Sequence, residues 1–462
     1  METIKLSQDE TSRLLLLCED HFNDIKSKRI APSKLQETFV AFANSDGGDL
    51  YVGVEDGAVQ GERLIGFTEH EEANAIITTL LEETLPSVEN VGVTFLKTEE
   101  NGYILHLAVP KSPKVHYTAS GDCFIRINAA KRKIKGERIT QLGYSKGAEL
   151  YERKPVADVE IKELLESRLL LDYMTRIGSK LDGPTFLRKQ RLLTTSGSDR
   201  IPNVGCVLLF DDVPQATLDT RCAVKVYRLR TTDKDYKREQ LEEMPVTING
   251  PVEQVIRGTI DQVARYIDGV TFQDGNQLVK LKYPAEALKE ILVNAVIHRD
   301  YSLNDDIHVR VFDNRVEVQS PGRLPGYMSV DNLYEERFSR NPNIVRMLHN
   351  LPNPVNHDIG EGLDTAKNEL KKAGLIAPIF EEKENAFVVT IKHQKIASVE
   401  DVVLSYFYDN PTAEITNKLV RQLSGEDDMQ KVKLALQKLR ASGHIRPVDE
   451  SANAFNFRYV KA

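Results

Sequence analysis

The strongest constraint on the fold is a helix-length run that is apolar on nearly every side. From Glu290 to His298 the residues are mostly Ile, Leu, Val and Ala, and the polar exceptions are Glu290, Asn294 and His298. These positions are spaced at i, i+4 and i+8, so they share one face of a helix. Burying the Asn294 carboxamide among Leu, Val and Ile costs about 1–3 kcal/mol unless it finds partners. The pattern therefore predicts a buried helix whose polar stripe faces a buried network, a solvent edge or a ligand.

The length and composition limit what can surround this helix. The chain has 462 residues, which suggests about three domains. Its 41% hydrophobic and 28% charged residues are typical of globular proteins and exclude a disordered tail, a collagen-like rod or a membrane bundle. The formal net charge of −8 counts against a general nucleic-acid coating protein. Any nucleic-acid site must therefore be a local basic patch.

The compartment follows from two negative signals. The sequence has no run of about 18 apolar residues and no secretory leader, so we expect a cytoplasmic protein that neither is secreted nor spans a membrane. Cys18, Cys123, Cys206 and Cys222 lie far apart, without a C-x-x-C pair or a nearby His at ligand spacing. This argues against a zinc site and a disulfide framework.

Periodicity and turn residues predict an α+β chain of four parts: residues 1–150, a helical connector at 151–200, a domain at 201–395 with a β-rich lead-in, and a separate module at 397–462. In the first part we expect a helix from residue 33 and strands at 50–54, 91–96, 103–109 and 123–127. In the third we expect strands at 204–210 and 221–230 in a small sheet, helices at 252–267 and 285–296, and a hairpin of strands 307–312 and 315–318. The last part reads as helices at 399–408, 414–423 and 429–442 and a β-ribbon at 444–459, the order of a winged helix-turn-helix.

Fixed glycines in the first part carry a family resemblance. The segments 41–48 (AFANSDGG) and 51–57 (YVGVEDG), followed by Gly66-Phe67, resemble the signature of the Schlafen-AlbA domain, also called the divergent AAA-type domain. The resemblance covers about residues 10–145. Gly47-Gly48 allow the chain to reverse between helix and strand without a Cβ clash.

The same resemblance implies a ribonuclease-type acidic site. Glu19, Asp24 and Lys26 are similar to the acidic pair and lysine that precede the glycine signature in Schlafen proteins, and the third carboxylate falls at Glu55 or Asp56. Such a trio would hold one or two Mg²⁺ or Mn²⁺ ions, and Lys26 would hold the phosphate. From the residues alone, Asp56-Gly57 also fits an ordinary turn, and Glu19 and Asp24 fit the solvated face of a helix.

A basic cluster follows in the same domain. Its cations crowd the segment from Arg126 to Arg138, and the candidates for nucleic-acid contact, with Lys26, are Arg126, Lys131, Arg132, Lys133 and Lys135. Such a cluster suits phosphate neutralisation, although it also fits a solvated loop. We favour nucleic-acid contact without cutting.

An ordered series of motifs around the apolar helix carries a second resemblance. The segments 283–290 (YPAEALKE), 298–301 (HRDY), 320–325 (SPGRLP), 339–342 (SRNP) and 360–363 (GEGL) resemble the C-terminal domain of bacterial RecG-like transcriptional regulators, a divergent branch of the GHKL ATPases. The resemblance spans about residues 200–392 and implies a GHKL-like α/β sandwich that binds ATP.

Residue roles carried over from that family place the chemistry on the polar stripe. The resemblance makes Asn294 the Mg²⁺ ligand that bridges to ATP phosphates and Glu290 the base that orients water. Gly360 and Gly362 would let backbone N–H groups approach phosphates before a helix that begins near Leu363. Ser320 and Gly322 stand where GHKL proteins read adenine with an Asp, so the usual acceptor is replaced.

The C-terminal module offers a further basic helix. Its third predicted helix carries Lys431, Lys433, Lys438 and Arg440 among leucines, which suits a DNA major groove. A small interaction or dimerisation domain fits equally well.

Taken together, these features predict an ATP-responsive, nucleic-acid-binding regulator of the transcriptional type, with ATP and Mg²⁺ (or Mn²⁺) as cofactors and a homo-oligomer as its assembly. Two alternatives stay open. One is a metal-dependent Schlafen-like endonuclease acting on RNA or DNA, such as a defence effector. The other is a scaffold with a degenerate GHKL domain.

Overall fold

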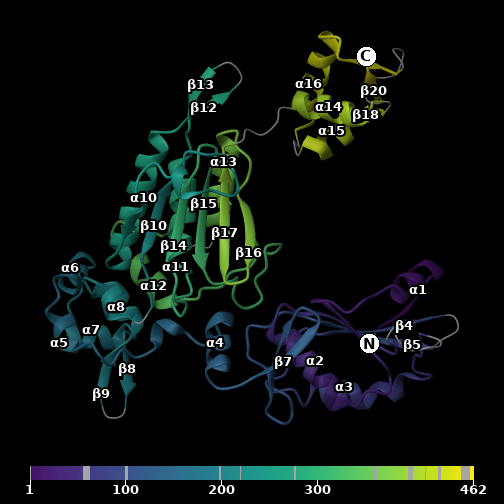
Figure 1. The fold of residues 1–462 in the computed structure, drawn as a ribbon, viewed down its shortest axis with the longest axis horizontal. Helices are drawn as coiled ribbons and strands as arrows, with labels where there is room; N and C mark the ends of the chain where they lie inside the picture. Colours follow the sequence, from purple (N-terminus) through teal and green to yellow (C-terminus); the bar gives the residue numbers. More distant parts are fainter. Residues whose placement is uncertain are drawn as a thin grey trace. The chain divides into compact units, whose positions relative to one another are not determined.

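The computed structural model of the chain has an α+β architecture with several sheets (Figure 1). It describes residues 2–55, 63–98, 102–196, 199–218, 220–274, 277–356, 362–393, 399–411, 413–424, 428–448 and 458–462. These residues form two compact units. One comprises residues 1–369 and 378–391, and the other comprises residues 370–377 and 392–462.

The first sheet of the large unit has the strand order β1-β4-β5-β3-β2. Its strands are β1 (Glu2–Lys5), β2 (Asn23–Lys26), β3 (Gly48–Val52), β4 (Gly92–Lys97) and β5 (Tyr103–Val109). β1 is parallel to β4 and β2 to β3, whereas β5 is antiparallel to both of its neighbours. Apolar residues of α2 (Pro32–Asn44) and α3 (Asn74–Leu81) share one core with this sheet. The short helices α1 (Gln8–Leu15) and η1 (His70–Ala73) belong to the same part of the chain.

A glycine turn joins α2 to β3, as the sequence predicts. Gly47 has φ +79° and Gly48 has φ +153°, a region that favours glycine. A Cβ on Gly47 would lie 2.6 Å from the Val109 carbonyl oxygen, and one on Gly48 would lie 2.4 Å from the Phe42 ring. This turn places Asp46 and the start of β3 beside the end of β5.

A β-hairpin covers the other side of α2. Its strands are β6 (Cys123–Ile127) and β7 (Ala130–Ile134), and Phe124 packs on Val40 and Ala41 of the helix. The Asn44 carboxamide fastens the hairpin to the end of α2, because its Nδ2 donates to the carbonyl oxygens of His116 at 2.8 Å and Phe124 at 3.0 Å.

Short helices and one hairpin connect the two sheets. They are α4 (Glu137–Lys146), η2 (Tyr151–Arg153), α5 (Ile161–Glu166), α6 (Arg168–Arg176), α7 (Gly183–Lys189), β8 (Leu193–Ser196), β9 (Asp199–Pro202), α8 (Val204–Phe210) and α9 (Pro214–Thr217). The strand expected at residues 204–210 is wrong, because this segment is the helix α8. Every residue of α8 is buried, and Asn203 caps it through a hydrogen bond from the Cys206 N–H at 3.0 Å. A short, continuously apolar run does not distinguish a buried helix from a buried strand.

The second sheet of the large unit has the order β11-β10-β14-β15-β17-β16. Its strands are β10 (Val224–Arg228), β11 (Val246–Ile248), β14 (Ile307–Val311), β15 (Arg315–Pro321), β16 (Ile379–Lys383) and β17 (Ala386–Lys392). β10 is parallel to β14, and the predicted hairpin of β14 and β15 is present. The lead-in therefore does not form the separate small sheet we expected, since β10 and β11 extend this larger one.

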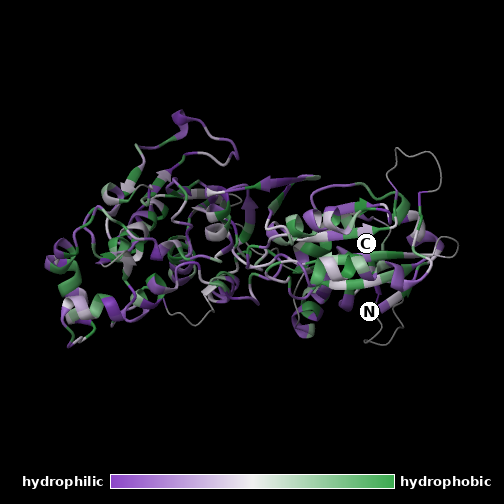
Figure 2. Cartoon of the chain, turned by 90° about the horizontal axis from the view of Figure 1, so that it is seen from below, coloured by the Kyte–Doolittle hydropathy of each residue, from purple (hydrophilic) through white to green (hydrophobic). Residues whose placement is uncertain are grey.

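Helices α10 (Val252–Asp268) and α11 (Ala285–Ile297) pack against each other and against strands of this sheet (Figure 1). The other elements here are η3 (Arg238–Gln240), the hairpin β12 (Thr271–Asp274) and β13 (Gln277–Lys280), α12 (Pro342–His349) and α13 (Gly362–Lys372). Figure 2 shows hydrophobic residues along many of the helices and strands and hydrophilic ones in many connections. Most residues of α11 are buried, as its largely apolar sequence predicts.

The small unit contains α14 (Val399–Asp409), β18 (Ile415–Thr416), α15 (Asn417–Ser424), α16 (Met429–Ala441), β19 (Ile445–Pro447) and β20 (Arg458–Lys461). The strands form an antiparallel sheet in the order β18-β20-β19. Val432, Leu436 and Leu439 of α16 join Phe407 of α14 in its core. The second helix starts three residues later than expected, because Ile415 and Thr416 pair with β20.

Across the described residues, the helices are too short or too polar for one to cross a membrane.

Candidate nucleotide cavity and nucleic-acid surface

A cavity of about 340 Å³ opens beside the polar stripe of α11. Its walls come from α11, β15, the segment after β15, the segment before α12, the start of α13 and β17. The lining residues that bear on its chemistry are Ile291, Asn294, Ala295, His298, Ser320, Gly322, Arg323, Leu324, Pro325, Met328, Phe338, Ser339, Gly362 and Asp364. Much of this wall is apolar, and polar groups stand at defined points, as is usual for small-molecule sites.

The stripe divides between the cavity and the start of α13. Asn294 and His298 line the cavity, whereas Glu290 is only 7% exposed and lies against Gly362. A Cβ on Gly362 would stand 2.6 Å from Glu290 Oε2 and 3.4 Å from Asn294 Nδ2. The structure thus brings Glu290, Asn294 and Gly362 together, while Gly360 lies outside the described residues.

The end of β15 forms another wall. The Ser320 hydroxyl donates to the Ala295 carbonyl oxygen at 2.7 Å, so it can offer a ligand only its lone pairs. Gly322 has φ +106°, and a Cβ there would lie 2.6 Å from Asp300 Cβ. Ser320 and Gly322 therefore both face the cavity, and the glycine is needed for close packing.

His298 belongs to the stripe, but sequence reasoning gave it no role. Its side chain is accessible from the cavity, although protein atoms surround it. That surrounding protein lowers its pKa to about 4, and the Arg340 guanidinium contributes to this decrease. At neutral pH the imidazole is uncharged, so it offers the cavity one hydrogen-bond donor and one acceptor.

Residues of the 339–342 motif hold two segments that line the cavity. Arg340 is 2% exposed and forms an ion pair with Asp300, which is 1% exposed. Its Nη2 also donates to the Arg323 carbonyl oxygen at 2.7 Å. The Asn341 side chain donates to the carbonyl oxygens of Ile297 and Arg299 at 2.9 and 2.8 Å. The motif therefore fastens the end of α11 to the segment after β15.

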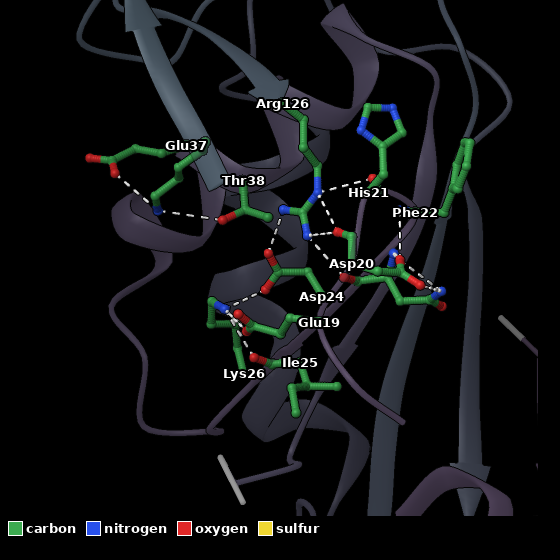
Figure 3. A network of polar contacts seen from close by, with 12 residues as sticks. Glu19, Asp20, His21, Phe22, Asp24, Ile25, Lys26, Glu37, Thr38 and Arg126 are labelled. Atoms are coloured by element: carbon green, nitrogen blue, oxygen red, sulfur yellow. Dashed lines mark hydrogen bonds and ion pairs between the residues drawn. The ribbon is translucent and has the colours of Figure 1, made fainter. Parts of the chain in front are cut away.

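The acidic residues of the first domain meet in a different environment (Figure 3). Asp24 is 3% exposed; its Oδ2 accepts from Arg126 Nη1 at 2.6 Å, and its Oδ1 forms an ion pair with Lys26. Lys26 also bonds Glu19. Burial by itself would lower the pKa of Lys26, but the bonds to Asp24 and Glu19 outweigh burial and raise it. Both oxygens of Asp24 are thus engaged by cations.

Of the other predicted members of the trio, only Glu55 lies in the described part of the chain. Glu55 accepts a hydrogen bond from Ser27 Oγ at 2.6 Å, and Asp56 lies outside the described residues. In the part of the chain that the structure describes, no three His, Cys, Asp or Glu side chains lie close enough together to hold a metal ion.

Arg126 serves the fold and does not reach the surface. It is 4% exposed, its guanidinium lies 4.4 Å from the centre of the Phe42 ring, and it donates to the carbonyl oxygens of Asp20, His21 and Asn23 (Figure 3). These bonds clamp segment 20–24 beneath β6. The expectation that Arg126 contacts nucleic acid does not fit this burial, because a phosphate could not approach it.

The other cations of the hairpin lie at its surface. Lys131 donates to the Lys34 carbonyl oxygen at 2.9 Å and pairs with Glu37 at 3.1 Å, and Lys133 pairs with Asp122 at 2.6 Å. Arg132 and Lys135 are exposed. Lys131 and Lys133, on the face of the hairpin that also carries Phe124 and Arg126, are therefore held by acidic neighbours, whereas Arg132 and Lys135 extend into solvent.

In comparisons with known proteins, two different families match the two regions described above. Residues 19–135 match the family described as "Schlafen, AlbA_2", and residues 304–391 match the family described as "Putative ATP-dependent DNA helicase recG C-terminal". Both predicted resemblances are confirmed. The first match includes the acidic residues and the basic hairpin. The second includes Ser320, Gly322 and Gly362 but begins after Glu290 and Asn294.

No curated protein matches this chain. Among solved structures, the chain is similar to the DIP2311 protein from Corynebacterium diphtheriae, at 16% identity and a TM-score of 0.40, with 98% of this chain and 96% of that chain covered.

Proposed function

We propose that this protein is a nucleic-acid-binding regulator that responds to ATP. The observation that carries the proposal is the cavity beside Asn294, where a carboxamide on an otherwise apolar helix faces a hollow of about 340 Å³. A hydrocarbon or a plain buried partner opposite Asn294 would have favoured a scaffold.

The nucleotide would bind with its phosphates toward Gly362 and its base toward Ser320. The Asn294 oxygen is a hard ligand of the kind that suits Mg²⁺, which commonly keeps several waters and binds one or two protein groups plus phosphates. Bound there, Mg²⁺ would supply compensation for phosphate charge. The small Gly362 leaves room beside Glu290, which we propose as the group that orients water.

The nucleic acid would lie on the β6–β7 hairpin. Arg132 and Lys135 extend into solvent, and Lys131 and Lys133 stand next to them in sequence, so the hairpin can neutralise several phosphates. The small unit provides a second candidate surface on α16, where Val432, Leu436 and Leu439 are buried and Lys433 is exposed. We propose that this unit is a winged helix-turn-helix module.

Nucleotide binding is tested by calorimetric titration of the full chain with ATP and Mg²⁺. We expect saturable binding that weakens about 10- to 100-fold in Asn294→Ala, the loss typical of a hydrogen bond to a charged group. Glu286→Ala, an exposed change on the same helix, is the matched control and should bind as the wild type does. Equal affinity in Asn294→Ala and the wild type would refute the assigned site.

Nucleic-acid binding is tested by fluorescence anisotropy with labelled RNA and DNA over a range of salt concentrations. We expect Arg132→Glu with Lys135→Glu to weaken binding and to reduce the salt slope by about one for each lost phosphate contact. Lys162→Glu with Arg168→Glu, at exposed sites on α5 and α6, makes the same change in net charge and is the control. The proposal fails if both variants bind alike.

A further inference from the structure

One wall of the nucleotide cavity is held by the first domain. We call residues 322–328 the cavity loop; its Gly322, Arg323, Leu324, Pro325 and Met328 line the cavity. Groups between residues 46 and 146 bind this loop directly, although they belong to the domain that carries the basic hairpin.

Lys111 makes two of these contacts. It follows the end of β5, and its Nζ donates to the carbonyl oxygens of Leu324 at 2.9 Å and Met328 at 3.0 Å. Because a single ammonium group joins both ends of this part of the loop, Lys111 fixes the spacing between Leu324 and Met328. The Gly326 N–H donates to the Lys146 carbonyl oxygen at 2.9 Å, which adds a third attachment.

Asp46 holds the side chain of the loop's cation. Arg323 Nη1 and Nη2 lie 3.1 and 2.9 Å from the two Asp46 oxygens, and Asp46 also contacts His21 Nε2 at 2.8 Å. Burial alone would raise the pKa of Asp46, but Arg323 and His21 outweigh it and lower that pKa. His21 lies in the segment that Arg126 clamps beneath the hairpin. A continuous set of contacts therefore runs from the cavity loop to β6.

Charged groups of both signs surround the loop. Lys111, Lys146, Arg323 and Arg340 gather with three acidic residues, Asp46, Asp300 and Glu382. Arg340 pairs with Asp300, and Arg323 pairs with Asp46 and Glu382. Lys111 is bonded to carbonyl oxygens, so its full charge is not neutralised by a direct ion pair.

We propose that Lys111 and Asp46 are positioning residues of the nucleotide cavity, and that they couple nucleotide binding to nucleic-acid binding on the hairpin. This inference rests on the proposed function and adds its regulation. A nucleotide that draws Arg323 toward the cavity weakens the Arg323–Asp46 pair and changes the support of segment 20–24. Coupling of this kind is reciprocal, so nucleic acid on the hairpin changes the affinity for ATP by the same factor.

The test measures ATP affinity by calorimetry, and nucleic-acid affinity by anisotropy with and without ATP and Mg²⁺, on the full chain. In the wild type we expect ATP to change nucleic-acid affinity by about 5-fold or more. In Lys111→Met and Asp46→Asn we expect weaker ATP binding and a smaller ATP-dependent change. Lys114→Met is the matched control, because Lys114 lies three residues away and pairs with the exposed Glu89.

Two further readings separate positioning from general damage. Lys111→Arg keeps the cationic donor and should recover most of the ATP affinity, and melting curves should show Asp46→Asn folded even if Lys111→Met is not. Unchanged ATP affinity and unchanged coupling in both variants would overturn this inference while leaving the proposed function standing. A wild type that does not bind ATP would overturn both.

Discussion

The acidic pair of the first domain and the polar stripe of α11 differ in how their polar groups are satisfied. Asp24 is enclosed, with one oxygen on Arg126 and the other on Lys26, so its charge is used within the fold. Asn294 stands at the wall of a cavity of about 340 Å³. Family motifs point to both places, but of Asp24 and Asn294 only Asn294 lines this cavity. Polar residues in a motif are therefore better evidence of a site when a hollow adjoins them.

The buried ion pairs of the two regions give the largest expected effects. Arg340→Met leaves the buried Asp300 without its cation, and Arg126→Met leaves the buried Asp24 with Lys26 alone, so each should lower the free energy of unfolding by about 3–5 kcal/mol. Urea unfolding followed by circular dichroism measures this loss. Arg132→Met, an exposed change on the hairpin, should stay within about 0.5 kcal/mol of the wild type. A loss below 1 kcal/mol in Arg126→Met would show that Asp24 does not depend on its partner.

Gly362, at the start of α13, provides a test of the cavity. Gly362→Ala places a methyl group against the Glu290 carboxylate, and an overpacking cost of about 1–3 kcal/mol in the ATP-bound state corresponds to roughly 5- to 150-fold weaker ATP binding. Gly269→Ala is a suitable control, because its nearest contact would be an ordinary 3.5 Å. Calorimetric titration distinguishes them, and equal affinities would argue that the phosphates lie elsewhere.

Metal-dependent cleavage of nucleic acid would contradict the difference drawn between Asp24 and Asn294. Because both Asp24 oxygens are engaged by Arg126 and Lys26, we expect no cutting of RNA or DNA in Mn²⁺ beyond the level seen in EDTA. Glu19→Ala, a change at a side chain that is 37% exposed, should alter unfolding by no more than about 0.5 kcal/mol. Electrophoresis of labelled RNA and DNA decides the matter: cutting by the wild type that disappears in Glu19→Ala would restore the endonuclease hypothesis.

The most gradual effect concerns pH near Lys146, because it builds up over several pH units. Burial lowers the pKa of Lys146 to about 7, with Lys111 contributing, and its Nζ donates to the Ala43 carbonyl oxygen at 2.8 Å. In the unfolded chain this lysine stays protonated to about pH 10.5, so between pH 7 and 10.5 the unfolded state binds more protons. Stability should therefore rise with pH above 7, by at most about 1.4 kcal/mol per pH unit from this group. Lys146→Met should flatten the slope of unfolding free energy against pH, and an unchanged slope would exclude Lys146 as its source.

Local patterns predicted much of the fold. The strands at 103–109 and 123–127, the helix α11 and the hairpin of β14 and β15 depend on residues close in sequence, and the structure has them at or near the expected bounds. The errors have a common cause. The helix at 204–210 and the membership of β10 in the large sheet depend on distant chain segments, which a local apolar pattern does not identify.

The candidate site divides in the same way. The spacing of Asn294 and His298 is local, so their shared face could be predicted, and both residues line the cavity, whereas Glu290 of the same stripe does not. The burial of Arg126 could not, because its partner Asp24 lies 102 positions away. The Arg323–Asp46 pair joins residues 277 positions apart, and in sequence neither residue carries a signal of the other.

The register of the β6–β7 hairpin separates the cation that supports the fold from a cation at the surface. Arg126 points into the protein, whereas Arg132, opposite Ile125, extends outward. Under the proposed function, mutations at Arg132 or Lys135 would change which polymer is recognised without disturbing the contacts of Arg126. Binding preference could then change by single substitutions of exposed side chains, with little loss of folding stability.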